Sequence, residues 1–286
     1  MWAEFKHTLS RLRGQIIGWA IGIALYSIMM AFLYPTVTGI EDLTQLYASF
    51  PEEMMVFFGD IMMINTPRGY LDTYFFSYMQ LIVGILAISV GASLLVGDEE
   101  RGILDLVLAH PVSRTALFWG RLLGLAVALI VVLLAGWLSW AIPAGSVGLG
   151  LGWIELLWPF LPLLSVLMLF ATLALLLSML LPAGRIAGML TGALLVGNFL
   201  LSGLAKISPD LEPVVDLTPL RYYQGGQAVE GLNWGWVAGL LAVALLLSAG
   251  AWLLFRRRDI RVGGERSWKL PRLIPRRARS QSHTIF

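Results

Sequence analysis

The sequence predicts an all-α integral membrane protein with six transmembrane helices and both termini in the cytoplasm. Composition is the first reason, because 58% of the 286 residues are apolar and only 13% are charged, against roughly 45–50% and 25% in soluble domains. The second reason is a series of long apolar runs, and the third is an uneven distribution of lysine and arginine between them. Together these observations argue against a soluble enzyme.

Six apolar runs are long enough to cross a bilayer, which takes about 20 residues of helix. They lie near residues 15–35, 74–96, 116–142, 156–181, 186–205 and 233–255. Only Pro182-Ala183-Gly184-Arg185 separates the fourth run from the fifth. A turn this short predicts an antiparallel hairpin, and an even number of spans places both termini on one side.

The basic residues predict which side that is. The side with both termini carries 17 of the 20 lysines and arginines, and the other side carries only Arg68, Lys206 and Arg221. Because basic residues near span ends stay on the cytoplasmic side, we expect both termini in the cytoplasm. For a prokaryote this is the inner face of the plasma membrane.

Both ends of the chain carry segments outside the spans. Trp2, Phe5, Leu9 and Leu12 recur at helical spacing, which predicts a helix along the cytoplasmic interface, with a disordered start as the alternative. We do not expect a cleaved signal peptide, because the first apolar run is about as long as a full span and no A-x-A-like cleavage site follows it. Residues 261–286 form a basic tail that should stay disordered and favour anionic lipid over nucleic acid.

Several chemistries are missing from the sequence. With no cysteine and only three histidines, none of them in a span, this chain has no thiolate or imidazole site for a metal in the membrane. Arg121 is the only charged residue inside an assigned span, and snorkelling to the interface is the expected explanation. No lysine follows a glycine, so the chain cannot form a phosphate-binding P-loop. We therefore expect no cofactor and no catalytic residue in this chain.

Small and polar residues recur within the spans. Glycines at four-residue spacing let helices approach closely, either within one protomer or between two, and they occur as Gly14, Gly18 and Gly22, as Gly120 and Gly124, and as Gly184, Gly188 and Gly192. Polar residues that share a face of spans two and five could line a pathway or simply bond neighbouring helices. They are Tyr78, Ser89, Ser93, Thr191, Asn198 and Ser202.

The loop between spans two and three contains a short apolar helix pattern. Leu104 and Leu108 belong to a turn too apolar for free solvent, Pro111 ends it, and Ser113 is placed to cap the next helix. Such a helix in a cytoplasmic loop can dock into another protein, or it can lie on the underside of its own bundle.

At this loop the sequence resembles the membrane subunits of type-2 ABC exporters, the ABC-2 permease family. The matching residues are Glu99, Glu100, Gly102, Leu104, Leu106, Leu108, Pro111, Val112, Ser113 and Arg114. Arg121 stands where the family often has lysine. Residues 218–223 and 255–260 resemble the segments that flank the family's last span, so the resemblance covers nearly the whole chain.

The resemblance implies a permease that pairs with a second copy of itself and with two ATPase subunits, which hold ATP and Mg. It implies export of a hydrophobic or amphiphilic compound, with spans two and five along the path and spans one and five near the dimer seam. The residues it assigns to ATPase coupling are Glu99, Glu100, Gly102, Leu104, Leu108, Pro111 and Arg114. The alternatives are an ATPase-linked membrane protein that transmits force or signals without a substrate, and a membrane scaffold.

The segment from Thr36 to Thr73 is acidic and should form short amphipathic helices over the outer face. Four methionines suggest a metal site there, but without cysteine or histidine nearby irregular packing is the preferred interpretation. They are Met54, Met55, Met62 and Met63.

Overall fold

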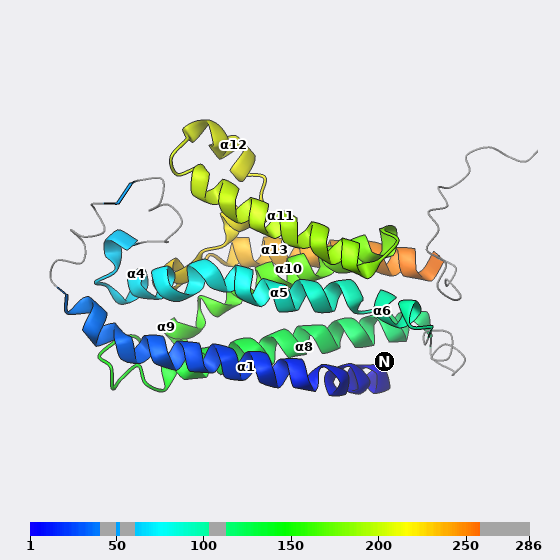
Figure 1. The fold of residues 1–286 in the computed structure, drawn as a ribbon, viewed down its shortest axis with the longest axis horizontal. Coiled ribbons are helices and arrows are strands. Elements are labelled where there is room, and N and C mark those ends of the chain that lie inside the picture. The colour runs from blue at the N-terminus through cyan, green and yellow to red at the C-terminus, as the bar shows by residue number, and fades with distance from the viewer. Residues whose placement is uncertain (41–49, 52–60, 103–112, 258–286) are drawn as a thin grey trace, which may run out of the picture.

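The computed structural model describes residues 1–40, 50–51, 61–102 and 113–257, and every regular element in these ranges is a helix. The helices run side by side along the long axis of the molecule (Figure 1). Six of them are long and apolar enough to cross a membrane, which confirms the predicted all-helical membrane class. They are Trp2–Thr38, Pro67–Ser93, Arg114–Ala141, Trp153–Leu180, Gly184–Leu204 and Trp234–Arg257.

The N-terminus of α1 (Trp2–Thr38) and the last turn of α13 (Trp234–Arg257) lie at the same end of the bundle (Figure 1). We call this end the inner end and the opposite end the outer end, after the orientation that the sequence predicts. The short α6 (Val96–Glu100) also lies at the inner end. The predicted helical hairpin is present, since α10 (Phe160–Leu180) and α11 (Gly184–Leu204) are joined by three residues and pack together.

The helix α10 occupies the centre of the bundle. It packs against α5 (Ser77–Ser93), α11, α13 and α8 (Arg114–Ala141), as expected for a helix that is apolar on every side. It approaches α5 closely at Gly91, where an added Cβ would lie 2.3 Å from the carbonyl oxygen of Ala171. Only glycine at this position allows the two backbones to pack so tightly.

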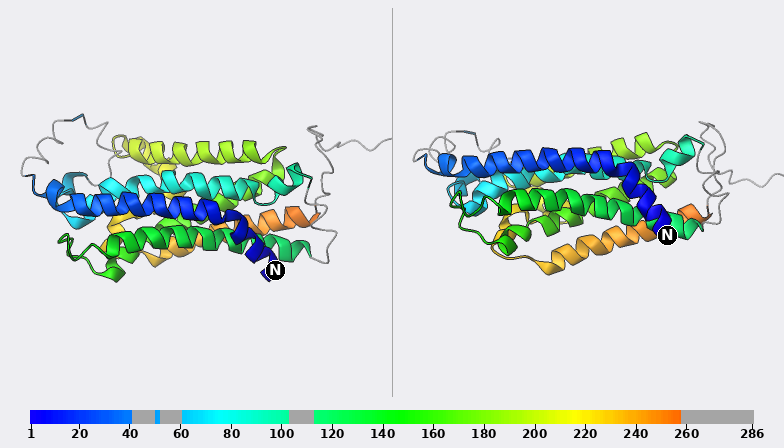
Figure 2. Two further views of the ribbon diagram at one scale, coloured as in Figure 1. Left: turned by 60° about the horizontal axis from the view of Figure 1, so that its bottom comes forward. Right: turned by 90° about the horizontal axis from the view of Figure 1, so that it is seen from below.

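The helix α1 packs along α8 and is continuous over 37 residues. The predicted interfacial helix is therefore not a separate element but forms the first turns of α1. At about 1.5 Å per residue such a helix is longer than the hydrocarbon core needs, and its first turns bend away from the rest (Figure 2). Gly120 and Gly124 of α8 lie against Glu4 and Thr8 in these turns, so this glycine pair serves packing within one chain.

The second membrane helix begins earlier than the sequence predicts. It consists of α4 (Pro67–Leu71), a π-helical turn η2 (Asp72–Phe76) and α5, and Thr66 caps its start by accepting a hydrogen bond from the backbone N–H of Gly69 (3.1 Å). The π-turn displaces backbone carbonyls from the regular helical pattern. Tyrosine hydroxyls from two other segments satisfy them, with Tyr26 donating to the carbonyl of Tyr74 and Tyr223 to that of Phe76 (2.9 Å).

Two charged residues lie deeper than the sequence suggests. Asp72 is only 8% exposed and belongs to the helix Pro67–Ser93, two residues before the predicted span 74–96. Arg121 does not snorkel, because it is 2% exposed and its guanidinium donates to the carbonyl of Leu94 (2.9 Å) and pairs with Asp98 (2.7 Å). The groups that stabilise this arginine are therefore protein groups, the carboxylate of Asp98 and the carbonyl of Leu94.

The remaining described elements are short and, apart from α6, lie toward the outer end. They are η1 (Ile61–Met63), α9 (Trp153–Leu157), η3 (Pro209–Leu211), α12 (Glu212–Val215), η4 (Pro219–Tyr222) and η5 (Gly225–Val229). At the other end, Ser113 caps α8 as predicted, accepting a hydrogen bond from the backbone N–H of Ala116 (3.2 Å). The predicted helix with Leu104, Leu108 and Pro111, the methionines Met54 and Met55, and the tail 261–286 lie outside the described residues.

Candidate functional site

A groove between α5 and α11 is one of the cavities in the described part of the bundle. Its volume is about 660 Å³, and its walls are largely aliphatic, with Ile85 of α5 and Met189 of α11 among the exposed side chains. Ser89 and Ser93 of α5 also line it. We call this cavity the lateral groove, and its composition suits the apolar part of an amphiphile.

The inner end of the lateral groove is bordered by Glu100 and Arg185. Glu100 accepts a hydrogen bond from the backbone N–H of Gly184 (2.9 Å). Its negative charge also interacts favourably with the positive N-terminal end of the α11 dipole. A Cβ at Gly184 would lie 2.9 Å from the carbonyl oxygen of Ala92. The start of α11 is thus bound directly to the segment that leads into the 103–112 loop.

A buried ion-pair cluster lies beside this junction. Asp98 of α6 pairs with Arg11 of α1 (2.8 Å) and with Arg121 of α8 (2.7 Å), and Glu4 lies 3.7 Å from Arg121. Arg121 also donates to the carbonyl of Leu94, just beyond the end of α5, where a positive charge is favourable. Three membrane helices and α6 therefore meet through charged contacts at the inner end.

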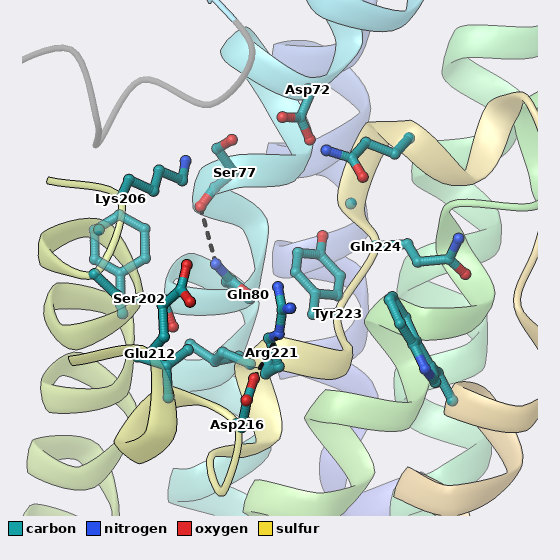
Figure 3. Close-up of a pocket in the computed structure, with 18 residues that line it drawn as sticks. Asp72, Ser77, Gln80, Ser202, Lys206, Glu212, Asp216, Arg221, Tyr223 and Gln224 are labelled. Carbon is teal, nitrogen blue, oxygen red and sulfur yellow. Dashed lines mark hydrogen bonds and ion pairs between the residues drawn. The ribbon is translucent and has the colours of Figure 1, made fainter. Parts of the chain in front are cut away.

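The outer cavity has a different character. It has a volume of about 330 Å³ and lies between α5, α11 and the segment from α12 to η5. Figure 3 shows polar side chains from these elements facing one another across it. The residues that line this cavity include Asp72, Gln80, Ser202, Lys206, Arg221 and Tyr223.

The deep part of the outer cavity is rich in hydrogen-bond acceptors. Gln80 is 6% exposed, its amide nitrogen donates to the carbonyl of Ser77 (3.2 Å), and its Oε1 has no hydrogen-bond partner in the described part of the chain. The hydroxyl of Ser202 likewise has no partner there. Asp72 accepts a hydrogen bond from the backbone N–H of Gly226 (2.7 Å).

Tyr223 forms another part of the same wall. Its burial, and then the negative charge of Asp72, raise the pKa of the Tyr223 hydroxyl well above its usual value. The hydroxyl therefore stays protonated and donates to the carbonyl of Phe76. This bond fixes the ring at the wall of the cavity and ties η4 to the π-turn.

The predicted pathway residues are divided between these cavities. Ser89 and Ser93 line the lateral groove, and Ser202 lines the outer cavity. Tyr78 contacts the ring of Phe199, which also lines the outer cavity. Asn198 donates its amide to the carbonyl of Leu194 (3.1 Å).

Thr191 is placed differently from the other predicted pathway residues. It is fully buried, donates to the carbonyl of Ala187 (2.8 Å) and lines neither cavity.

The two glycine series of α1 and α11 differ in their surroundings. A Cβ at Gly14, Gly18 or Gly22 of α1 would meet nothing within 4 Å outside its own helix. Gly184 and Gly188 instead lie against Ala92 of α5, while Gly192 faces open space. Packing within one chain thus accounts for Gly184 and Gly188 of α11 but not for the three glycines of α1.

A third cavity of about 550 Å³ lies between α1 and α5 and exposes Gly18 and Gly22. Ile82 of α5 lines both this cavity and the lateral groove. The two cavities therefore lie on either side of the exposed side chains Ile82 and Ile85, which we call the exposed ridge of α5.

The coupling residues predicted from the resemblance are only partly described. Glu99 and Glu100 belong to α6, Gly102 follows it with a positive φ of 68° that suits glycine, and Arg114 donates to the carbonyl of Phe255 (3.3 Å). Among the described residues no group of three histidine, aspartate or glutamate side chains is placed to hold a metal ion. Met62 and Met63 are exposed.

Sequence reasoning missed Gln80, Asp72 and Tyr223 of the outer cavity. A polar amide within an apolar run was a usable signal for Gln80. The role of Asp72 and Tyr223 depends on contacts between segments about 150 residues apart, which no local pattern reveals.

Comparison with known proteins adds one finding to this geometry. A family model described as ABC-2 family transporter protein matches residues 5–260, which is nearly the whole chain. No curated protein matches the chain.

Proposed function

The chain belongs to the ABC-2 transporter family, and on this premise we propose that it is the permease subunit of an ATP-driven exporter. The transported compound is hydrophobic or amphiphilic and moves outward, from the inner end of the bundle to the outer end. Both termini then lie in the cytoplasm of a prokaryote, as the basic residues predict.

The observation that carries this proposal is the hydrogen bond between Glu100 and the backbone N–H of Gly184. It joins the segment before the 103–112 loop to the start of α11, and α11 forms one wall of the lateral groove. A displacement of the loop by a bound ATPase would therefore act directly on the width of the groove. The neighbouring cluster of Asp98, Arg11 and Arg121 links the same segment to α1 and α8.

The energy for transport enters from separate subunits in this proposal. Two ATPase subunits, which hold ATP and Mg, dock at the inner end, since no P-loop lysine is present in this sequence. Leu104 and Leu108 supply the apolar contact in the loop, with Glu99, Gly102, Pro111 and Arg114 around it. Burial of each leucine contributes roughly 1.5–3 kcal/mol before the cost of ordering the loop.

A second copy of the chain completes the transporter. The face with the exposed ridge of α5 carries both the lateral groove and the cavity beside Gly18 and Gly22. Two such faces placed together would enclose the grooves, and the open glycines of α1 allow a partner helix to approach closely. The rest of the apolar surface faces membrane lipid.

The test is transport by the reconstituted complex. The permease, purified with its ATPase in proteoliposomes whose ATPase sites face the bath, is supplied with ATP and an amphiphilic fluorescent dye. We expect ATP-dependent accumulation of the dye inside, and none with an ATPase whose P-loop lysine is replaced. ATP hydrolysis that depends on the permease but moves no amphiphile would instead support the force-transmitting or signalling alternative.

A matched pair of variants tests the coupling step. Glu100→Gln keeps an oxygen that accepts from the backbone N–H of Gly184, and Glu100→Ala removes it. Glu100→Ala should lower transport per ATP hydrolysed several-fold, and Glu100→Gln should lower it less. Equal transport per ATP for both variants and the wild type would contradict the role of this contact.

A further inference from the structure

The lateral groove combines a long apolar body with charged side chains at its inner end only. We propose that the groove binds a single-chain amphiphile with an anionic headgroup, with the headgroup at Arg185 and the chain between α5 and α11. This inference rests on the proposed export function for its role in transport. It narrows the class of compound that the permease takes up from the inner side.

Most polar side chains of the groove already have hydrogen-bond partners. The polar residues of its lining are Ser89, Ser93, Glu100 and Arg185. Ser89 and Ser93 each donate to a carbonyl of their own helix (3.0 and 2.8 Å), and Glu100 accepts from the backbone N–H of Gly184 (2.9 Å). The first three polar groups therefore serve the fold.

Arg185 differs from these groups because it makes no hydrogen bond or ion pair with any other residue that the structure describes. Its side chain is exposed at the inner end of the groove. A guanidinium group donates hydrogen bonds and accepts none, so the group that completes it must be an acceptor. Carboxylates and phosphates fit its planar set of donors best, because they accept two parallel hydrogen bonds and carry the opposite charge.

The length of the groove fits one chain of a membrane amphiphile. Along α11 the lining extends from Gly184 to Val196, and these 12 steps cover about 18 Å at 1.5 Å per residue. Along α5 it extends over the same number of steps, from Leu81 to Ser93. Half of a hydrocarbon core of about 30 Å is roughly 15 Å. An alkyl chain in the groove would therefore reach the middle of the membrane while its headgroup stayed at the inner end.

The walls of the groove suit such a chain along this whole length. Ile85 of α5 and Met189 of α11 expose 64% and 66% of their surface, and the volume of about 660 Å³ is typical of ligand sites. Gly188 and Gly192 widen the α11 side because they carry no side chain. Since α5 and α11 pack on each other, the chain would lie in a depression with a closed floor.

The test uses the absence of cysteine from this sequence. The full chain with Ser93→Cys, at the inner part of the groove, is purified in phosphatidylcholine nanodiscs, and its rate of modification by a small uncharged thiol reagent is measured. The probes are dodecyl phosphate, dodecanol and dodecyltrimethylammonium, which share a chain and differ in headgroup charge. Inorganic phosphate is tested alone. The control is Leu246→Cys, since Leu246 of α13 is 72% exposed and lies outside the groove.

We expect dodecyl phosphate to slow modification of the Ser93→Cys variant about tenfold and to leave the Leu246→Cys variant unchanged. Dodecanol and dodecyltrimethylammonium, at equal amounts in the membrane, should slow it less than twofold. Equal protection by either of them would show that the headgroup is not recognised. Equal protection by inorganic phosphate would show that the site takes an ion rather than an amphiphile. Each of these results would overturn the proposal.

Substitutions of Arg185 then test the named contact in the Ser93→Cys background. Arg185→Gln should raise the dodecyl phosphate concentration needed for half-protection about tenfold, the usual effect of losing one hydrogen bond to a charged group. Arg185→Lys keeps the charge but loses the paired donors, so its shift should be smaller. The matched control is Arg13→Gln, at an exposed arginine of α1 at the same end of the bundle and outside the groove, which should change the concentration less than twofold.

Unchanged protection in Arg185→Gln would contradict a headgroup site at this residue. Equal shifts in Arg185→Gln and Arg13→Gln would also contradict it, because the probe would then respond to the surface charge of the whole inner end. This assay contains no ATPase, so its outcome is independent of transport. Protection without ATP-dependent export of the dye would refute the proposed function and leave the headgroup site standing, and export of the dye without protection would do the reverse.

Discussion

Replacement of Arg121 by methionine tests the buried ion-pair cluster at the inner end. The change keeps most of the side-chain volume but removes the partner of Asp98 and the donor to the carbonyl of Leu94. Asp98, which is 4% exposed, would retain only the pair with Arg11. The variant therefore leaves a buried carboxylate and a buried carbonyl with fewer partners.

The expected destabilisation follows from the burial of these groups. Removing one member of a buried ion pair costs about 3–5 kcal/mol, and the remaining pair of Asp98 with Arg11 places this variant at the lower limit. At 2–4 °C per kcal/mol for a chain of this size, a loss of 3 kcal/mol lowers Tm by roughly 6–12 °C. Arg121→Lys keeps the charge but has fewer donors, so its Tm should lie between that of the wild type and that of Arg121→Met.

The assay is thermal unfolding of the full chain in nanodiscs. The matched control is Arg221→Met, because Arg221 pairs with Asp216 in an exposed position and such pairs contribute at most about 1 kcal/mol. Adding Asp98→Asn to Arg121→Met should recover part of the lost Tm, since the two residues interact directly. Equal Tm values for Arg121→Met and Arg221→Met would refute the buried cluster and favour an arginine at the membrane interface.

Three further predictions follow from the fold and the proposed function. Gly91→Ala should destabilise the chain by about 1–3 kcal/mol because its Cβ has no space against α10, whereas Gly18→Leu should leave the Tm of the monomer nearly unchanged and lower the dimer yield in detergent. In intact cells, Ser208→Cys should react with an impermeant thiol reagent and Ser10→Cys should not, and the reverse pattern would contradict the orientation. Leu104→Asp should prevent recovery of the ATPase with a tagged permease that still inserts normally, and wild-type recovery would exclude this loop as the docking element.

The membrane helices could be predicted from the sequence because their signal is local. A run of about 20 apolar residues is sufficient to form a span whatever it packs against. The cap at Ser113 is equally local, since the side chain bonds a backbone N–H three residues later. The short turn before Gly184 is also a local signal, because two helices joined by so few residues must pack antiparallel, as α10 and α11 do.

The cavities and the buried charges depended on contacts that no local pattern encodes. Arg121 finds its partners on α1 and α6, so its distance from the span end gave the wrong explanation. Asp72 preceded the predicted second span, but the π-turn extends the helix through it, and η5 covers it from the far end of the chain. Gln80 and Ser202 line the same cavity only because α11 packs on α5.

In the proposed exporter the substrate passes along the lateral groove, and chemical blockage of that groove tests this path directly. Ser89→Cys places a thiol in the groove, and Ser146→Cys places one on an exposed loop away from it. Each variant complex is treated with a bulky maleimide, and ATP-dependent transport of the dye is then measured in proteoliposomes. We expect modification to abolish transport by the Ser89→Cys complex and to leave the Ser146→Cys complex active. Full transport by the modified Ser89→Cys complex would show that substrate does not pass along the groove.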